Sequence, residues 1–128
     1  MRVLLDTQVV IDAYRPNGFL TLPKKLQEIL ANPENDRLIS SVSIVEIGVK
    51  SALGKLQITE AQTRQAIRDM CLTVIPLKQQ HAFQFFSMTQ RSDPFDRMIV
   101  ATALSEGIPL AGKDREFKSY HGLQVIWD

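Results

Sequence analysis

The chain has 128 residues, of which 45% are hydrophobic and 23% are charged, values typical of globular domains rather than of disordered or fibrous chains. Fifteen Lys and Arg residues against fourteen Asp and Glu residues leave a net charge of +1, so the overall charge gives no reason to expect a nucleic-acid partner. A chain of this length can bury roughly two thirds of its unfolded surface, which predicts one domain over residues 1–128.

Short apolar runs alternate with helical patterns along the chain. The runs predict strands at 3–5, 37–40, 73–77, 108–111 and 124–127. The helical patterns lie at 8–14, 23–32, 43–54, 59–71, 78–90 and 94–106. Parallel strands need crossover connections that return a helix to the sheet, so this order predicts an α/β fold with three layers, α/β/α, and a mostly parallel central sheet.

The location of the protein is suggested by short apolar runs and a single cysteine. Cys71 cannot form an internal disulfide, which fits a reducing compartment. The first apolar run ends at Asp6 after three residues, far short of a signal-peptide core. The longest apolar stretch, MIVATAL, is much shorter than the about 20 residues that span a membrane. We therefore expect a cytoplasmic protein with no membrane partner.

Four acidic residues fall where an α/β sheet places its ligand site, outside the carboxyl ends of the strands. Asp6 follows the first predicted strand directly, and Asp114 comes three residues after the strand at 108–111. Glu46 and Asp96 are expected to open the helices at 43–54 and 94–106, facing the same edge. We therefore expect these four acids, which come from distant segments of the chain, to form one acidic pocket.

The same acids also fit ordinary helix capping. Ser43 and Glu46 have the spacing of a capping box, in which each side chain bonds the other residue's backbone. Asp93 fits an N-cap followed by Pro94 at the first helical position. Capping or helix-dipole roles are equally open, taken singly, for Asp6, Asp96 and Asp114.

Convergence favours a metal site over capping, because caps have no need to lie together. Asp96 also shares its helix face with Ile99, Val100 and Ala103, which should point inward. Carboxylates held together near a core are costly unless a cation or a proton compensates them. Mg²⁺ and Mn²⁺ prefer oxygen ligands of this kind, so we expect Mg²⁺ or Mn²⁺ in the pocket.

Four blocks of sequence resemble the PIN-domain nucleases and, among them, the VapC-type toxins of bacterial type II toxin-antitoxin pairs. The blocks are LLDT at 4–7, SSVSIVEIGVKSALGKL at 40–56, SDPFDRMIVATAL at 92–104 and LAGKDREF at 110–117. By resemblance, the acidic quartet that binds Mg²⁺ or Mn²⁺ for hydrolysis of RNA consists of Asp6, Glu46, Asp96 and Asp114. The resemblance also implies a homodimer and inhibition by a small cognate antitoxin protein.

Two positions depart from the pattern of this family. Gly112, two residues before Asp114, stands where the family often has a threonine or serine hydroxyl. Gln8 stands where many relatives of this subgroup have histidine. Neither change removes a proposed ligand.

Supporting and RNA-binding roles are expected for six more residues. Thr7, Ser43 and Asp93 should support the ligands, with Asp93 explained by its helix cap. Lys50, Arg97 and Lys113 lie beside the acids in sequence and are candidates for phosphate contacts. Lys50 also lies four residues after Glu46, so pairing with that carboxylate along the helix is an equally open role.

The two histidines and one pair of helices also allow predictions. His81 and His121 lack metal-ligand spacing and are expected to pack or to lie on the surface. A groove between the helices at 23–32 and 43–54 could hold an amphipathic segment of an antitoxin.

Two other functions compete with the nuclease. A phosphoryl-accepting receiver domain would also be α/β with acids at the sheet edge, but TVIPLKQQ offers no acceptor aspartate after its strand. A catalytically silent binding module with the same fold is the second alternative.

Overall fold

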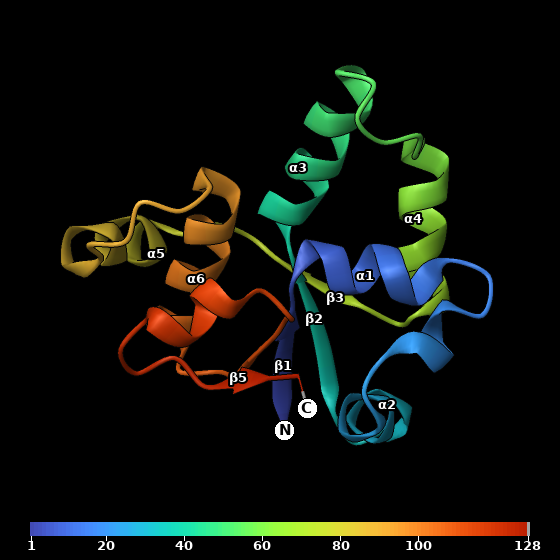
Figure 1. The fold of residues 1–128 in the computed structure, drawn as a ribbon, viewed down its shortest axis with the longest axis horizontal. Helices are drawn as coiled ribbons and strands as arrows, with labels where there is room; N and C mark the ends of the chain where they lie inside the picture. The colour runs from blue at the N-terminus through green and yellow to red at the C-terminus, as the bar shows by residue number, and fades with distance from the viewer. Residues whose placement is uncertain (128) are drawn as a thin grey trace.

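Five parallel strands form the centre of the molecule, described for residues 1–127 in a computed structural model (Figure 1). The sheet has the order β3-β2-β1-β4-β5, and every neighbouring pair is parallel. Receiver domains have the strand order 2-1-3-4-5, so the receiver alternative is wrong. The strands are β1 Arg2–Leu5, β2 Asp36–Ser40, β3 Thr73–Ile75, β4 Leu110–Ala111 and β5 Val125–Ile126.

Helices cover both faces of this sheet, which confirms the predicted three-layer α/β/α fold (Figure 1). Each of the six predicted helices is present, although α5 is shorter than expected and continues into a 3₁₀ turn at Phe85–Ser87. Further 3₁₀ turns lie at Gly18–Thr21 and Arg115–Ser119. The helices are α1 Thr7–Tyr14, α2 Lys24–Ala31, α3 Ser41–Ala52, α4 Glu60–Asp69, α5 Gln79–Gln84 and α6 Pro94–Glu106.

Alternation along β1 and β2 divides the core into two halves. Leu4 and Leu38 point to the face covered by α6, where they pack with Ile99 and Val100. The neighbouring residues of the strands, including Leu5 and Ile39, point to the other face, toward α1 and α2. Successive side chains of a strand point to opposite faces, so strands this apolar must be buried on both sides.

The start of α3 differs from the prediction. The helix begins at Ser41, and the Oγ of Ser40 accepts a hydrogen bond from the Val42 N–H at 3.0 Å. The capping box expected at Ser43 and Glu46 is therefore wrong, and Glu46 lies well inside the helix instead of opening it. The sequence Ser40-Ser41-Val42-Ser43 offers several caps, and the strand register selects the first.

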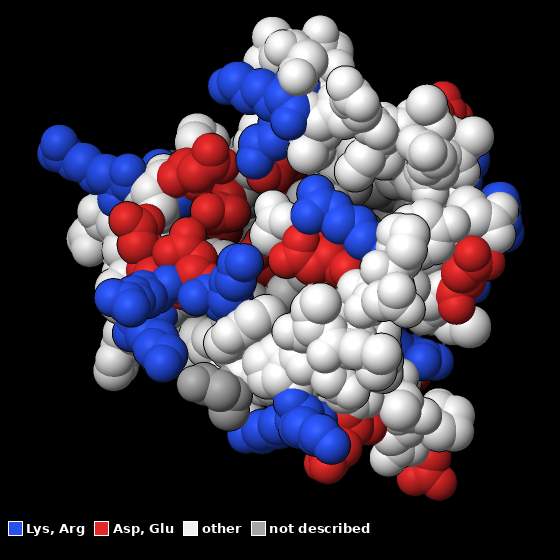
Figure 2. All heavy atoms as spheres, turned by 45° about the vertical axis from the view of Figure 1, so that its right-hand side comes forward, with Lys and Arg blue, Asp and Glu red and all other residues white. Residues whose placement is uncertain are grey.

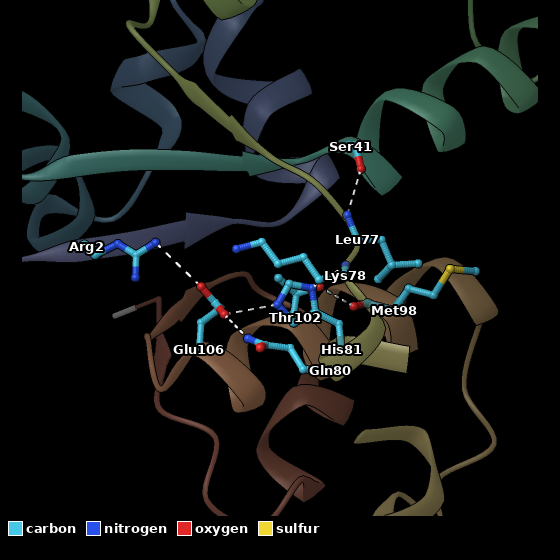
Figure 3. Close-up of polar contacts among 9 residues, drawn as sticks. All are labelled: Arg2, Ser41, Leu77, Lys78, Gln80, His81, Met98, Thr102 and Glu106. Atoms are coloured by element: carbon cyan, nitrogen blue, oxygen red, sulfur yellow. Dashed lines mark hydrogen bonds and ion pairs between the residues drawn. The ribbon is translucent and has the colours of Figure 1, made fainter. Parts of the chain in front are cut away.

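A polar cluster around His81 joins α5 to the end of α6 (Figure 3). The Lys78 N–H donates to His81 Nδ1 at 2.9 Å, so the neutral ring carries its proton on Nε2, 3.2 Å from Glu106 Oε2. The hydrogen bond from His81 lowers the pKa of Glu106, which also accepts from Gln80 and lies 3.9 Å from Arg2. His81 is completely buried, as a packing role requires, whereas His121 is exposed.

None of the helices in residues 1–127 has the length and apolar character needed to cross a membrane.

Candidate metal centre

A cleft of about 470 Å³ opens at the carboxyl ends of the strands. It lies between the first turns of α1 and α6, the middle of α3 and the loop after β4. On the face shown in Figure 2, acidic side chains gather beside a hollow and lysine and arginine side chains border them. The structure thus brings four predicted ligands to one cleft, whose lining includes Asp6, Glu46, Asp96 and Asp114.

Asp6 joins β1 to α1 at the floor of the cleft. Its N–H donates to the Ala111 carbonyl at 2.9 Å, which extends the β1–β4 pairing and fixes the backbone. The side chain makes no capping hydrogen bond to α1 beyond a contact with the adjacent Thr7 N–H that lowers its pKa, so capping does not explain this aspartate. Asp6 is only 6% exposed, and its Oδ1 accepts no hydrogen bond from any described residue. A buried carboxylate oxygen without a partner is costly and requires an explanation.

Thr7 and Ser43 connect the two helices that carry Asp6 and Glu46. The Thr7 hydroxyl donates to Ser43 Oγ at 2.7 Å, and both side chains are buried. Ser43 lies three residues before Glu46 on the same face of α3, while Thr7 follows Asp6 directly. The hydrogen bond therefore fixes the relative position of these two carboxylates.

Glu46 is 5% exposed and presents two different oxygens. Its Oε2 lies 2.6 Å from Lys50 Nζ, one turn further along α3. Its Oε1 is buried and, within the described part of the chain, has no hydrogen-bond partner. The pairing of Lys50 with Glu46, one of the two roles expected for this lysine, is confirmed, and the hydrogen bond to Glu46 raises the pKa of Lys50.

Two aspartates at the N-terminus of α6 have different roles. Asp93 caps the helix, and Asp96 lines the cleft. Asp93 Oδ1 accepts from the Phe95 N–H at 2.8 Å and from the Asp96 N–H at 3.4 Å, so Asp93 is the N-cap, with Pro94 at the first helical position. Asp96 is left half-buried at the cleft with its carboxylate uncommitted to capping. The cap supports the helix turn that presents Asp96.

Asp114 is more exposed than the other three acids. Its Oδ1 accepts from the Glu116 N–H at 3.0 Å, so the capping role considered for it is confirmed. Beside it, Lys113 Nζ lies 3.9 Å from Asp12 Oδ2 of α1. The chain thus places Asp114 at the exposed rim of the cleft, with its second oxygen not used in the cap.

Mutual repulsion and burial shift two of these carboxyl groups. Burial, followed by the charges of Asp96 and Glu46, raises the pKa of Asp6 to about 7. Burial, followed by the charges of Glu46 and Asp93, raises the pKa of Asp96 to about 6. Burial and repulsion between carboxylates raise both pKa values, and a bound proton or cation would relieve both effects.

The donor set suits a hard divalent cation. The uncommitted donors of the cleft are carboxylate oxygens, the ligands preferred by Mg²⁺ and Mn²⁺, and two of them are buried without partners. In residues 1–127 no three His, Cys, Asp or Glu side chains are already arranged to hold a metal ion. The carboxylates therefore share a cleft without forming a ready coordination shell.

Arg97 follows Asp96 in sequence, but it lies outside the lining of the cleft. Its guanidinium lies 5.0 Å from the centre of the Phe85 ring, and the residue does not line the cleft. Lys50 and Lys113, the other two candidates for phosphate contacts, do line it.

Sequence reasoning gave no role to Asp12, which organises the rim near Lys113. Asp12 Oδ1 accepts from Gln8 Nε2 at 2.8 Å and lies 3.4 Å from Arg15 Nη1. The spacing of Gln8 and Asp12, one helical turn apart, is the signal that could have revealed this pair. Gln8 thus holds a hydrogen bond on the exposed side of α1.

Gly112 packs so closely against its neighbours that a side chain would not fit there. A Cβ placed there would lie 2.5 Å from Phe117 Cε2 and 3.2 Å from Asp6 Cβ. Phe117 is 1% exposed, so its ring has little room to move. The ring therefore leaves no room for a side chain at position 112.

This contact predicts that Gly112→Ala lowers the free energy of unfolding by about 1–3 kcal/mol, the usual cost of overpacking a core. Urea denaturation measures the loss, and a second change, Phe117→Leu, should recover part of it. Gly48→Ala is the matched control, because a Cβ at Gly48 meets no atom within 4 Å and alanine favours the helix. Equal stability of the Gly112→Ala variant and the wild type would contradict this packing.

The comparisons with known proteins agree with this architecture. The family model described as PIN domain matches residues 3–123. A search of curated proteins finds no match. Among solved structures, VapBC2 from Rickettsia felis bound to a promoter DNA fragment is similar, with 19% identity, full coverage of both chains and a TM-score of 0.71.

Two further structures have the same fold. DNA-bound VapBC from Salmonella typhimurium shares 21% identity with a TM-score of 0.70, covering 98% of this chain and 97% of that one. VapBC-1 from nontypeable Haemophilus influenzae shares 20% identity with a TM-score of 0.65, at the same coverage. The family model covers most of the chain, and the fold and strand order agree with it, so the chain belongs to the PIN domain family.

Proposed function

We propose that the protein is a Mg²⁺- or Mn²⁺-dependent ribonuclease and the toxin of a VapC-type toxin-antitoxin pair, acting in the cytoplasm. One observation carries the proposal: Asp6 and Glu46 each bury a carboxylate oxygen that has no partner among residues 1–127, in a cleft that they share with Asp96 and Asp114. A divalent cation relieves both the desolvation and the repulsion of these groups.

Asp6, Glu46 and Asp96 would hold the cation, with Asp114 completing the set from the rim. Because the side chains form no ready shell, they must close around the ion when it binds. A bound divalent cation supplies an activated water and stabilises negative charge on the phosphate. The chain's own contribution is to hold Asp6 and Glu46 in place through the Thr7–Ser43 hydrogen bond and to exclude water at the cleft floor.

The RNA backbone must approach an acidic cleft, so local positive charge is required. Lys50 and Lys113 line the cleft and are suited to contact phosphates on either side of the acids. Arg97 lies over the Phe85 ring and outside the cleft lining, so its contact with RNA stays a prediction.

The antitoxin is the second proposed partner, supported by the similarity to solved VapBC structures. The groove predicted between 23–32 and 43–54 stays a prediction, and we favour a different surface for the antitoxin. An apolar cavity of about 360 Å³ lies among α1, α3 and α4, and its lining includes Ile47, Ile58 and Ile67. An amphipathic helix of an antitoxin suits a groove of this character.

The homodimer implied by the sequence resemblance remains a prediction. Light scattering of the purified chain, free of its antitoxin, distinguishes a dimer from a monomer of 14.5 kDa.

RNA cleavage tests the proposed activity. Purified chain, free of antitoxin, should cleave single-stranded or structured RNA with Mg²⁺ or Mn²⁺ and should lose this activity in chelator. Asp96→Asn should abolish cleavage, because a metal ligand is lost, whereas Asp12→Asn removes a nearby carboxylate outside the quartet and should remain active. Cleavage that persists in chelator and in Asp96→Asn would contradict the metal site, and failure to cleave any RNA would favour a silent binding module.

A further inference from the structure

One oxygen of Glu46 is already taken by a positive charge from the same helix. Lys50 Nζ lies 2.6 Å from Glu46 Oε2, and the side chains are 38% and 7% exposed, respectively. The pair spans one turn of α3, so helix geometry holds the ammonium near the carboxylate even when both side chains move. Glu46 Oε1, by contrast, is buried and accepts no hydrogen bond from the described residues.

The difference between the two oxygens of Glu46 limits the ways in which this carboxylate can coordinate a cation. A carboxylate that bridges two ions, or that binds one ion through both oxygens, needs both oxygens free. Lys50 occupies one lone-pair direction of Oε2, and its positive charge opposes a cation at that oxygen. Oε1 has no partner among the described residues and is the oxygen left open to a metal, and Asp6 supplies a second unpartnered oxygen, Oδ1, in the same cleft.

Lys113 provides an internal comparison. It lines the same cleft, but its ammonium lies near Asp12 at 3.9 Å and, among the described residues, makes no ion pair with a member of the quartet. The two lysines therefore add similar positive charge to the cleft, while Lys50 alone of the two engages a proposed ligand.

Resting on the proposed metal site, we propose that Lys50 is a positioning residue that reserves Glu46 Oε2 and thereby limits the cleft to one divalent cation per chain. Lys50 stands in place of a second ion: it neutralises part of the charge of Glu46 and keeps N–H groups available to a phosphate, but it activates no water as a metal would. Removal of its charge opens Oε2 and makes room for a second cation.

Counting Mn²⁺ bound to the full chain in the absence of RNA tests this inference. Equilibrium dialysis, with electron paramagnetic resonance to measure free Mn²⁺, should give one ion for the wild type and two for Lys50→Met. Lys50→Arg preserves the ion pair and should return the count to one. Lys113→Met removes the same charge from the same cleft and should also give one.

Each outcome separates this inference from the proposed nuclease. Two ions in the wild type, or one ion in Lys50→Met with an unchanged circular dichroism spectrum, would overturn the role of Lys50 and leave the metal site intact. Two ions in Lys113→Met as well would show that only general charge matters, which also overturns it. Absence of bound Mn²⁺ in both the wild type and Lys50→Met would reject the metal site itself along with this inference.

Discussion

Replacing Asp6 by asparagine is expected to make the metal-free protein more stable at pH 8 while it abolishes RNA cleavage. The gain should be on the order of 2 kcal/mol, because the substitution removes a buried charge that is repelled by Asp96 and Glu46. The gain stays below the full effect of the pKa shift, because a buried amide also lacks a good partner. Cleavage should fall by about 100-fold or more, since even changes around metal ligands cost roughly 10- to 100-fold.

The direction of the pH dependence follows from the raised pKa. Asp6 has a pKa of about 7 in the folded chain against an ordinary value of 3.8, so the folded state binds more protons than the unfolded state between these values. The free energy of unfolding of the metal-free wild type should therefore fall as the pH rises from about 4 to about 7. Thermal denaturation in chelator across this range should show a shallower fall for Asp6→Asn.

Asp12→Asn is the matched control for this stability experiment. Asp12 lies on α1, the helix that follows Asp6, but it accepts a hydrogen bond from Gln8 and lies near Lys113, so its charge is favourable. Its replacement should lower stability slightly or leave it unchanged. A loss of stability in Asp6→Asn at pH 8 would show that the Asp6 carboxylate is already compensated in the metal-free chain, and the electrostatic reason for a cation would then be lost.

Divalent cation binding should weaken by roughly 20-fold between pH 8 and pH 6, because metal ligands must be deprotonated. At pH 8 both carboxyl groups are largely ionised. At pH 6 about one tenth of Asp6 and about half of Asp96 are ionised, given pKa values of about 7 and about 6. Ordinary aspartates would remain ionised throughout and would give almost no change.

Isothermal titration of Mn²⁺ into the full chain at pH 6, 7 and 8 measures this dependence. Titration in two buffers of different ionisation enthalpy should also detect proton release near pH 7. The variant Asp96→Asn should bind more weakly with a smaller pH dependence, since one titrating ligand is gone. An affinity that is the same at pH 6 and pH 8 would exclude Asp6 and Asp96 as the ligands.

Sequence reasoning succeeded where a local pattern determines the structure. The strands at 3–5 and 37–40 are apolar enough to require burial on both faces, and Asp93-Pro94 marks the start of α6 without ambiguity. The convergence of Asp6, Glu46, Asp96 and Asp114 also follows from topology alone, because parallel strands end at one edge of the sheet.

The features that could not be predicted from the sequence depend on tertiary packing. The start of α3 was misplaced because several serines could cap it, and only the pairing of β2 with β3 selects Ser40. The burial of Phe117 against Gly112 joins positions whose contact no periodicity indicates. The contact of Arg97 with Phe85 likewise depends on how the turn at Phe85–Ser87 packs against α6, which the adjacency of Arg97 to Asp96 in sequence does not reveal.

Diffraction from crystals soaked in Mn²⁺ tests the proposed metal centre most directly, because anomalous scattering locates the ion. We expect a peak in the cleft at about 2.2 Å from carboxylate oxygens that include Asp6 and Asp96, with Glu46 contributing Oε1. Anomalous peaks confined to other parts of the surface, with Asp6, Glu46 and Asp96 still separate and free of metal, would contradict the metal centre.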